Sequence, residues 1–325
     1  MSLPPPDPQY ILRGSGAQIN TLHFRCDNEG PPLLFSGSGN GAVHVWNLNT
    51  RRPEKVLEGH SSSSIIWVST LNSRETLISQ GRDMRVCVWD LGEGRGDVTE
   101  AFVTGSVGFC QCSLLETSPG RWLLAYPGEQ MEEVRVAEFP SLIPVCSLKP
   151  DSKAGMLMSV KIWQKDSGGC PEIVAGYEDG SVVLWDVTQR RPVSCLKVYS
   201  EPVMCLDFDS GRLKGASGSS EKVISSWTID EKQNLQMHDS VELVNPGISQ
   251  LRVRDDGKIL ASAGWDNNLR VFAWKKKLRP LAVLKHHTDM VLSVGFSDHH
   301  DPRQRLLAAG SKDQRISLWS IYNQS

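Results

Sequence analysis

The chain has 325 residues, 39% of them hydrophobic and 22% charged, as expected of a globular protein with a sizeable core. Its formal charge of -2 gives no overall field that would attract nucleic acid or an anionic membrane. Eight dispersed cysteines without a C-x-x-C pair indicate reduced thiols, and no apolar run reaches the length of about 18 residues that spans a membrane. We therefore expect a cytoplasmic or nuclear protein, or one of both compartments, with no membrane or direct nucleic-acid partner.

The N-terminus begins with a proline-rich segment and then a short apolar one. Residues 1–8 contain three successive prolines and are expected to form a flexible N-terminus. Residues 10–14 read Tyr-Ile-Leu-Arg-Gly and resemble the apolar segments at 55–59 and 282–286, each of which precedes a later repeat. This similarity predicts a strand that begins near Tyr10.

An internal repeat follows, in which an alternating strand ends in an aromatic residue. Six copies end at Trp46, Trp89, Trp185, Trp227, Phe272 and Trp319. A seventh copy, between the second and the third of these, has Ala137 in place of the aromatic residue. The spacing of 42 to 48 residues is typical of a propeller blade of four antiparallel strands.

Polar residues that favour turns occur six positions before the end of most copies. They are Asn40, Asp83, Asp179, Glu221, Asp266 and Asp313. The third copy has Met131 instead, so we expect its blade to be the least regular.

The chain ends only six residues after Trp319, too soon for the outer strand of a seventh blade. The strand predicted near Tyr10 supplies it and pairs two edges that would otherwise be exposed. The predicted fold is all-β: a seven-bladed β-propeller closed by an N-terminal strand, with residues 9–325 as a single domain.

Two repeats carry a histidine, a turn aspartate and a tryptophan. The second repeat also has a serine, which completes the set His60, Ser79, Asp83 and Trp89. These four resemble a catalytic relay, but we interpret them as a structural network that ties a loop to a strand. The last repeat has Ala309 where the serine would lie, so we expect an incomplete network and weaker tethering there.

The Trp-Asp pairs at 89–90 and 185–186, and the segments 175–186 and 308–320, resemble the WD40-repeat family and its G-protein beta-subunit-like members. The resemblance extends from Tyr10 to Tyr322. It implies a scaffold of the ASTRA type that helps the triple-T cochaperone complex to mature phosphatidylinositol-3-kinase-related kinases. True beta subunits carry an N-terminal helix that forms a coiled coil with the gamma subunit. No heptad precedes Tyr10 here, so no gamma subunit is expected, and the chain is expected to be monomeric by itself.

Enzyme and cofactor motifs are missing from the sequence. There is no G-x-x-x-x-G-K-[ST], no H-E-x-x-H and no Cys/His zinc spacing. We therefore expect no catalytic residues, no cofactor and no metal, and we predict a non-enzymatic protein.

Two surfaces remain as candidates for binding other proteins. The first is the rim formed by residues next to the turn positions: Arg82, Tyr177, Glu178, Trp265 and Lys312. Trp265 is the expected anchor, because Trp and Arg dominate interface hot spots, although it could instead pack over a neighbouring loop. The second is a set of basic hairpins at the opposite ends of the blades: Arg51, Arg52, Arg190, Arg191, Lys275, Lys276 and Lys277. We interpret these charges as solvated, with binding of an acidic or phosphorylated partner segment as the alternative.

Two functional classes stay open. A protein-interaction scaffold is favoured by the repeat fold. A reader of a modified or acidic peptide, such as a phosphodegron or methyl-lysine adaptor, requires aromatic or basic residues to converge. One tryptophan and one tyrosine with mixed charges are few for an aromatic cage, so the scaffold is preferred.

Overall fold

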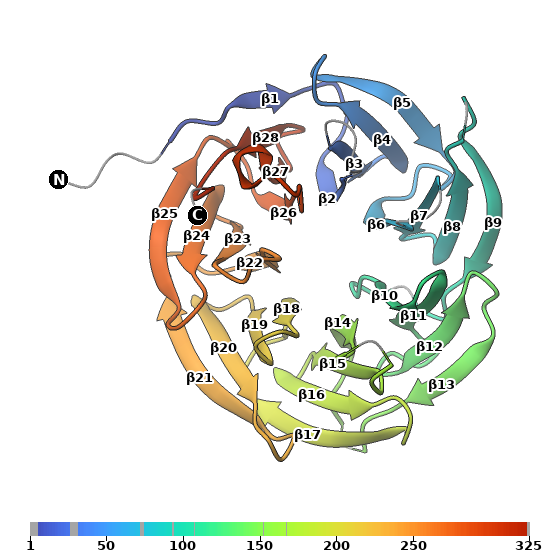
Figure 1. Ribbon diagram of the computed structural model, residues 1–325, viewed down its shortest axis with the longest axis vertical. Helices are drawn as coiled ribbons and strands as arrows, with labels where there is room; N and C mark the ends of the chain where they lie inside the picture. The colour runs from blue at the N-terminus through green and yellow to red at the C-terminus, as the bar shows by residue number, and fades with distance from the viewer. Residues whose placement is uncertain are drawn as a thin grey trace. The chain divides into compact units, whose positions relative to one another are not determined.

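The computed structural model describes residues 6–26, 32–71, 75–92, 94–106, 108–151, 153–166 and 168–323. The predicted flexible segment 1–8 therefore lies mostly outside the described residues. Within them the strands form seven four-stranded antiparallel sheets, the blades of the predicted all-β propeller (Figure 1). The helical content of these residues is one short 3-10 helix, η1 (Pro302–Gln304), and none of their helices is long and apolar enough to cross a membrane.

The first two blades and the last are as follows. Blade 1 comprises β2 (Ile19–Arg25), β3 (Leu33–Ser38), β4 (Ala42–Asn47) and β5 (Arg52–Glu58). Blade 2 comprises β6 (Ile65–Leu71), β7 (Thr76–Gly81), β8 (Arg85–Asp90) and β9 (Asp97–Val103). Blade 7 comprises β26 (Val291–Phe296), β27 (Leu307–Ser311), β28 (Ile316–Trp319) and β1 (Tyr10–Leu12).

The other four blades repeat the same order of strands. Blade 3 comprises β10 (Ser113–Ser118), β11 (Arg121–Pro127), β12 (Val134–Phe139) and β13 (Pro144–Leu148). Blade 4 comprises β14 (Leu157–Trp163), β15 (Glu172–Tyr177), β16 (Ser181–Asp186) and β17 (Arg191–Lys197). Blade 5 comprises β18 (Cys205–Asp209), β19 (Lys214–Gly218), β20 (Val223–Ile229) and β21 (Leu235–Glu242). Blade 6 comprises β22 (Ile248–Val253), β23 (Ile259–Gly264), β24 (Asn268–Ala273) and β25 (Arg279–Lys285).

The chain divides into two compact units. The first consists of Met1–Val103, Arg254–Trp274 and Arg279–Ser325, and the second of Thr104–Val253 and Lys275–Leu278. Blades 1, 2 and 7 with β23, β24 and β25 thus belong to the first unit, and blades 3, 4 and 5 with β22 to the second. That residues 9–325 form a single domain stays a prediction.

Burial explains why these segments become strands. The two middle strands of a blade are buried on both faces, so they are short runs of apolar and small residues rather than alternating ones. The outer strand β17 is more exposed, and it carries Arg191, Ser194 and Lys197 among its apolar residues. The core lies between neighbouring sheets, as where Leu318 and Leu12 of blade 7 pack with Leu22 and Trp46 of blade 1.

The N-terminal strand completes the last sheet, as predicted. In β1, Tyr10 lies opposite Leu318 and Leu12 lies opposite Ile316 of β28 (Figure 1). Leu12 is fully buried, and the guanidinium of Arg51 lies 4.8 Å from the centre of the Tyr10 ring. The hydrogen bonds of β1 therefore cover an edge of β28 that would otherwise be unpaired.

The third blade is more regular than its sequence suggests. It has four strands, and the register shift that other blades show beside their aromatic residue occurs here between Val136 and Ala137. Its first pair of strands differs, because the irregularity lies at Glu116 and Ser118, at the far end of β10. The missing aromatic residue thus does not change the course of the strands.

Candidate protein-binding site

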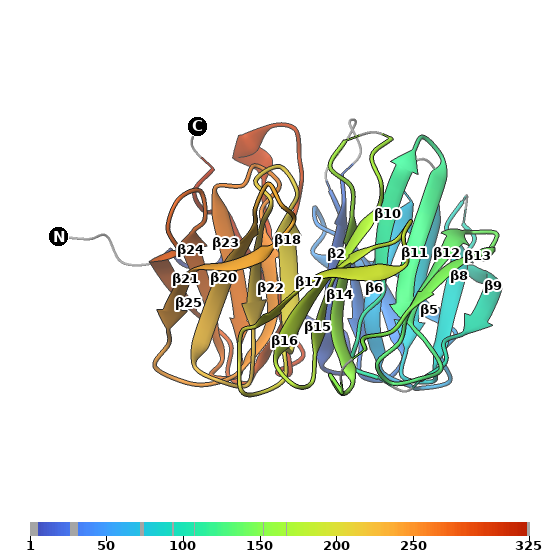
Figure 2. The ribbon, with the colours of Figure 1, turned by 90° about the horizontal axis from the view of Figure 1, so that it is seen from below.

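Each blade has two ends. We call the end with the turn between its second and third strands, and with the connection to the next blade, the turn end. The hairpins between the first and second strands and between the third and fourth lie at the other end, which we call the hairpin end. The strands of the sheets run between these ends (Figure 2).

Blade 2 joins its four predicted network residues beneath the turn. His60 Nδ1 donates to the Asp83 carboxylate at 3.0 Å, so its Nε2 accepts from Ser79 Oγ at 2.8 Å. Trp89 Nε1 donates to the same Ser79 oxygen at 2.8 Å. Gly81 makes room for this arrangement, because a Cβ there would overlap the His60 ring and lie 2.5 Å from Asp83 Oδ1. His60 and Ser79 are both fully buried.

Blade 7 has a complete network, contrary to our expectation. His287 Nδ1 donates to Asp313 at 3.0 Å, and its Nε2 lies 2.8 Å from Ser317 Oγ. Trp319 Nε1 donates to Ser317 at 2.9 Å. Ser317 on β28 thus takes the place of the serine that is missing at position 309 on β27. This is possible because the two strands lie side by side and both can direct a hydroxyl beneath the turn. The expectation of an incomplete network, from which we predicted weaker tethering of this loop, was therefore wrong.

Blade 5 uses a tyrosine in the position of the histidine. Tyr199 follows β17 by two residues, as His60 follows β5. Its hydroxyl donates to the Ser217 carbonyl at 2.5 Å and accepts from Ser225 N at 3.0 Å. Burial raises the pKa of this phenol to about 12, so it stays protonated and keeps its donor.

Blade 4 fills the same region with Tyr177, which corrects our assignment of this residue to the rim. Tyr177 ends β15 and stands eight residues before Trp185, as Gly81 stands eight residues before Trp89. It is fully buried in a cluster with Cys110, Leu157 and Trp185, and burial raises the pKa of its phenol. Its side chain therefore supports the turn from below and is not offered to a partner.

Blades 3 and 6 hold their turns with residues that sequence reasoning missed. In blade 3 the carboxylate of Glu133 accepts from Glu129 N at 2.8 Å and from Ser147 Oγ at 2.5 Å, and so replaces the turn acid that Met131 lacks. In blade 6 the carboxylate of Asp266 is paired with Arg270 of its own blade rather than with a histidine. In the sequence, the carboxylate two residues after Met131 was the available signal for the support of the blade 3 turn. The direction in which this side chain points, however, depends on packing.

The other rim residues lie at the turn ends of their blades. Arg82, Glu178 and Lys312 are exposed, and Trp265 is half-buried. Glu178 Oε2 accepts from Met156 N at 2.9 Å, which fixes its carboxylate over the loop that enters blade 4. Arg82, Trp265 and Lys312 belong to the first unit and Glu178 to the second. Their role in binding stays a prediction.

The basic hairpins are exposed, but several of their cations have partners within the chain. Arg51 stacks on Tyr10, and Arg190 Nη2 donates to the Val145 carbonyl at 3.0 Å. Arg191 Nε donates to Gln189 Oε1 at 2.6 Å. The remaining members of this basic patch are also exposed: Arg52, Lys275, Lys276 and Lys277.

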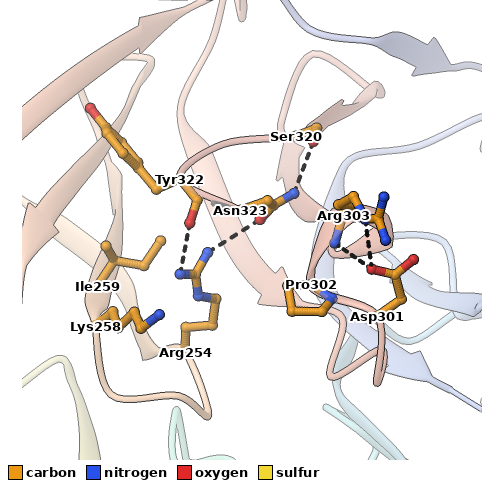
Figure 3. Close-up of a pocket in the computed structure, with 9 residues that line it drawn as sticks. All are labelled: Arg254, Lys258, Ile259, Asp301, Pro302, Arg303, Ser320, Tyr322 and Asn323. Atoms are coloured by element: carbon orange, nitrogen blue, oxygen red, sulfur yellow. Dashed lines mark hydrogen bonds and ion pairs between the residues drawn. The ribbon is translucent and has the colours of Figure 1, made fainter. Parts of the chain in front are cut away.

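A pocket of about 1180 Å³ lies at the hairpin end in the first unit (Figure 3). Arg254 holds the C-terminal segment beside it: its guanidinium donates to the carbonyls of Ile321 at 3.2 Å and Tyr322 at 3.0 Å, and pairs with Asp256 at 2.9 Å. The pocket walls include Lys258, Asp301, Arg303 and Tyr322. The guanidinium of Arg254 is thus used to anchor the tail, and sequence reasoning did not identify this region.

Comparison with known proteins identifies relatives along the whole chain. The model of the WD domain, G-beta repeat, matches residues 51–90, 234–273 and 278–320. Guanine nucleotide-binding protein subunit beta-like protein 1 of Mus musculus is 49% identical over 98% of this chain and 97% of its own length. ASTRA-associated protein 1 of Schizosaccharomyces japonicus is 30% identical, and that of Schizosaccharomyces pombe 26%, each over 98% of this chain and 99% of its own length. These matches, together with the seven four-stranded sheets, show that the chain belongs to the WD40-repeat family, in the group that contains guanine nucleotide-binding protein subunit beta-like protein 1.

Proposed function

We propose that this protein is a non-enzymatic scaffold of an ASTRA-type assembly. By its resemblance it is a cofactor of the triple-T cochaperone complex in the maturation of phosphatidylinositol-3-kinase-related kinases, in the cytoplasm, the nucleus or both. The observation that carries the proposal is the similarity to proteins named ASTRA-associated protein 1 over 98% of this chain. The shared part is therefore the entire set of blades rather than a single repeat.

The geometry of the relay-like residues supports a structural role rather than chemistry. A nucleophile must reach its substrate, whereas Ser79 is fully buried and its hydroxyl is held between His60 and Trp89. Blade 5 replaces the histidine with Tyr199, a group that stays protonated and cannot act as the base. The set is thus a support beneath the turn, which leaves the exposed turn ends for contacts with other proteins.

The alternative reader of a modified peptide receives less support. With Tyr177 buried, Trp265 is the one aromatic residue left in the predicted set Arg82, Tyr177, Glu178, Trp265 and Lys312, and a methyl-lysine cage needs more than one. A phosphate pocket would need free guanidinium groups, whereas Arg51, Arg190 and Arg191 contact other residues of the chain.

The test is purification of the tagged chain from cells, with identification and quantification of the bound proteins. We expect subunits of the triple-T and ASTRA assemblies among the stoichiometric partners and no G-protein gamma subunit. Depletion of the chain should lower the steady-state amounts of several phosphatidylinositol-3-kinase-related kinases while their messenger RNA is unchanged. Capture of none of these subunits by the folded chain, with unchanged kinase amounts after depletion, would overturn the proposal.

A further inference from the structure

We propose that the turn end of the second unit is a docking surface for a basic segment of a partner protein, one in which Lys and Arg flank apolar side chains. This inference rests on the proposed scaffold function and names the chemistry of one partner segment. We call this surface the acidic rim. It comprises the turn-end segments 105–106, 108–111, 128–133, 153–157, 178–180, 198–202, 219–222 and 243–247.

The segments of the acidic rim are joined to one another by direct contacts. Gly105 packs on the backbone of Glu129 so closely that a Cβ there would overlap it. Leu157 N donates to the Met131 carbonyl at 2.8 Å, and Glu178 N donates to the Met156 carbonyl at 2.9 Å. These contacts connect the loop before blade 3, the turn of blade 3 and the turn of blade 4.

Further bonds extend the rim to its other end. Glu201 N donates to Glu221 Oε1 at 3.2 Å, and Gly247 N donates to the Glu221 carbonyl at 3.1 Å. Gln250 of β22 then reaches Gln111, in the loop before β10, at 3.4 Å. The acidic rim is therefore a continuous surface, with its two ends linked through this pair of glutamines.

Three of the most exposed large apolar side chains lie on this rim. Phe109 is 54% exposed, Met131 60% and Val244 82%. Val244 occupies the position that His60 and Tyr199 fill in other blades, two residues after the outer strand, yet it points to solvent instead of beneath a turn. Apolar groups exposed in this way at a surface can anchor a partner.

Carboxylates predominate among the charged groups between these apolar side chains. The rim carries, exposed or half-exposed, Glu129, Glu132, Glu178, Asp179, Glu201 and Glu221. Its cations are fewer: Lys153 and Lys222, with Lys197 and Arg135 at its border paired to Asp179 and Glu129 respectively. Glu221 is fixed by hydrogen bonds from Ser200 N and Ser200 Oγ at 2.9 Å, so part of the negative charge is already positioned.

Charge complementarity therefore selects the occupant. An acidic surface steers a basic segment and disfavours an acidic one, while apolar anchors supply most of the affinity. An acidic or phosphorylated peptide, which the basic hairpins would suit, is not the ligand of this surface.

The test uses three labelled synthetic peptides of about 15 residues and the full chain, with binding measured by fluorescence anisotropy at physiological salt. One peptide alternates Lys with Leu, the second Glu with Leu, and the third Lys with Ser. We expect the Lys/Leu peptide to bind at least about tenfold more tightly than either of the others. Equal binding of the Glu/Leu or the Lys/Ser peptide would overturn the proposal.

Variants locate the binding. The triple change F109S, M131S and V244S removes the apolar anchors and should weaken binding of the Lys/Leu peptide at least about tenfold. The double change E132K and E201K alters charge on the same surface without removing an apolar group, and it should weaken binding by at least about the same factor. The matched control is V103S with M237S, which removes apolar side chains that are 68% and 47% exposed on the outer strands β9 and β21, and it should change binding less than about twofold. Unchanged binding by the E132K, E201K variant, or equal loss in the control, would contradict the assignment.

A failure of the acidic-rim proposal can be distinguished from a failure of the proposed scaffold function. If triple-T and ASTRA subunits co-purify equally with the parent chain and with both rim variants, the scaffold function stands and the acidic rim is not its surface. If the parent chain captures none of them, the scaffold proposal fails whatever the peptides do.

Discussion

Blades 2 and 4 place different chemistry in the same space beneath the turn. In blade 2, Gly81 leaves room for His60, which bonds Asp83 and Ser79. In blade 4, Tyr177 stands where Gly81 stands and fills the region with its own ring, against Trp185. The blade thus requires this space to be filled, and both a buried hydrogen-bond network and a buried aromatic ring satisfy the requirement.

Mutation should destabilise the polar network of blade 2 and the buried ring of blade 4 by different mechanisms. Loss of a partner from the polar network of blade 2 leaves a buried donor or acceptor unsatisfied, at a cost of about 1 to 3 kcal/mol. Loss of the ring from blade 4 leaves a cavity, and large aromatic truncations in cores cost about 3 to 5 kcal/mol.

The largest effect is expected where a blade is assembled from both ends of the chain. Deletion of residues 1–14 removes β1 from blade 7, exposes the edge of β28 and uncovers the site of Leu12. Unlike a side-chain substitution in blade 2 or blade 4, which removes no strand from the chain, this deletion leaves blade 7 without its outer strand. We expect aggregation and a lower melting temperature, measured by light scattering after gel filtration and by thermal unfolding. A truncated chain that stays monomeric and melts with the parent would contradict the closure by β1.

Tyr177→Ala should be the most damaging single change beneath a turn. It removes a fully buried ring from the cluster with Cys110 and Trp185, so we expect the free energy of unfolding to fall by about 3 to 5 kcal/mol. Denaturant titration measures this loss, with Tyr177→Phe as the control that keeps the ring. A loss as small as that of the control would show that the ring does not fill the space.

Asp83→Ala should cost less, about 1 to 3 kcal/mol, because His60 and the amide of Arg85 lose an acceptor but no large void forms. His60→Ala combined with Asp83→Ala should cost less than the sum of the two single changes, since both break the same bonds. Purely additive losses, or a single variant as stable as the parent, would show that the residues are not coupled.

The smallest effect concerns pH. Burial lowers the pKa of His44 and of His287 below the ordinary value, against the opposing effect of Asp313 on His287. The unfolded chain then binds more protons than the folded one between the lowered values and about 6.5, so stability falls as pH decreases through that window. Thermal unfolding between pH 7.5 and 5.5 should show this fall.

His44→Phe is the variant that isolates one contribution to the pH dependence. It removes a titrating ring that stacks on Trp46 at 5.7 Å between ring centres, while an aromatic ring is retained. Its melting temperature should depend less on pH than that of the parent. A steeper or unchanged dependence would exclude His44 as a source.

The course of the chain could be predicted from the sequence because it depends on a repeated pattern. Seven strand endings, from Trp46 to Trp319, six of them with a turn residue six positions earlier, indicated the number and type of blades. The similarity of residues 10–14 to later outer strands indicated how the last blade is completed. The strand pattern and the repeat spacing are retained even where the aromatic residue is missing, as at Ala137.

The supports beneath the turns could not be predicted in the same way. In blade 7 the missing serine is replaced by Ser317, which lies on the neighbouring strand. In blade 3 the missing turn acid is replaced by Glu133, which lies two positions further along the chain. Tyr177 follows a small residue on a buried strand and looks like a rim residue until its side chain is seen to turn inward. Each substitution preserves a position in space rather than a position in the sequence, so it becomes visible only when the strands are paired.

Variants at the turn end and at the hairpin end show most directly which end of the blades binds partner proteins. Capture of triple-T and ASTRA subunits is measured for Trp265→Ala at the turn end and for a triple charge reversal of Arg190, Arg191 and Lys276 at the hairpin end, with melting temperatures as the check on folding. We predict that Trp265→Ala weakens capture by about 2 kcal/mol, roughly 30-fold, while the charge reversal leaves it nearly unchanged. Normal capture by a folded Trp265→Ala chain, with capture abolished by the charge reversal, would contradict the account and place the working surface at the hairpin end.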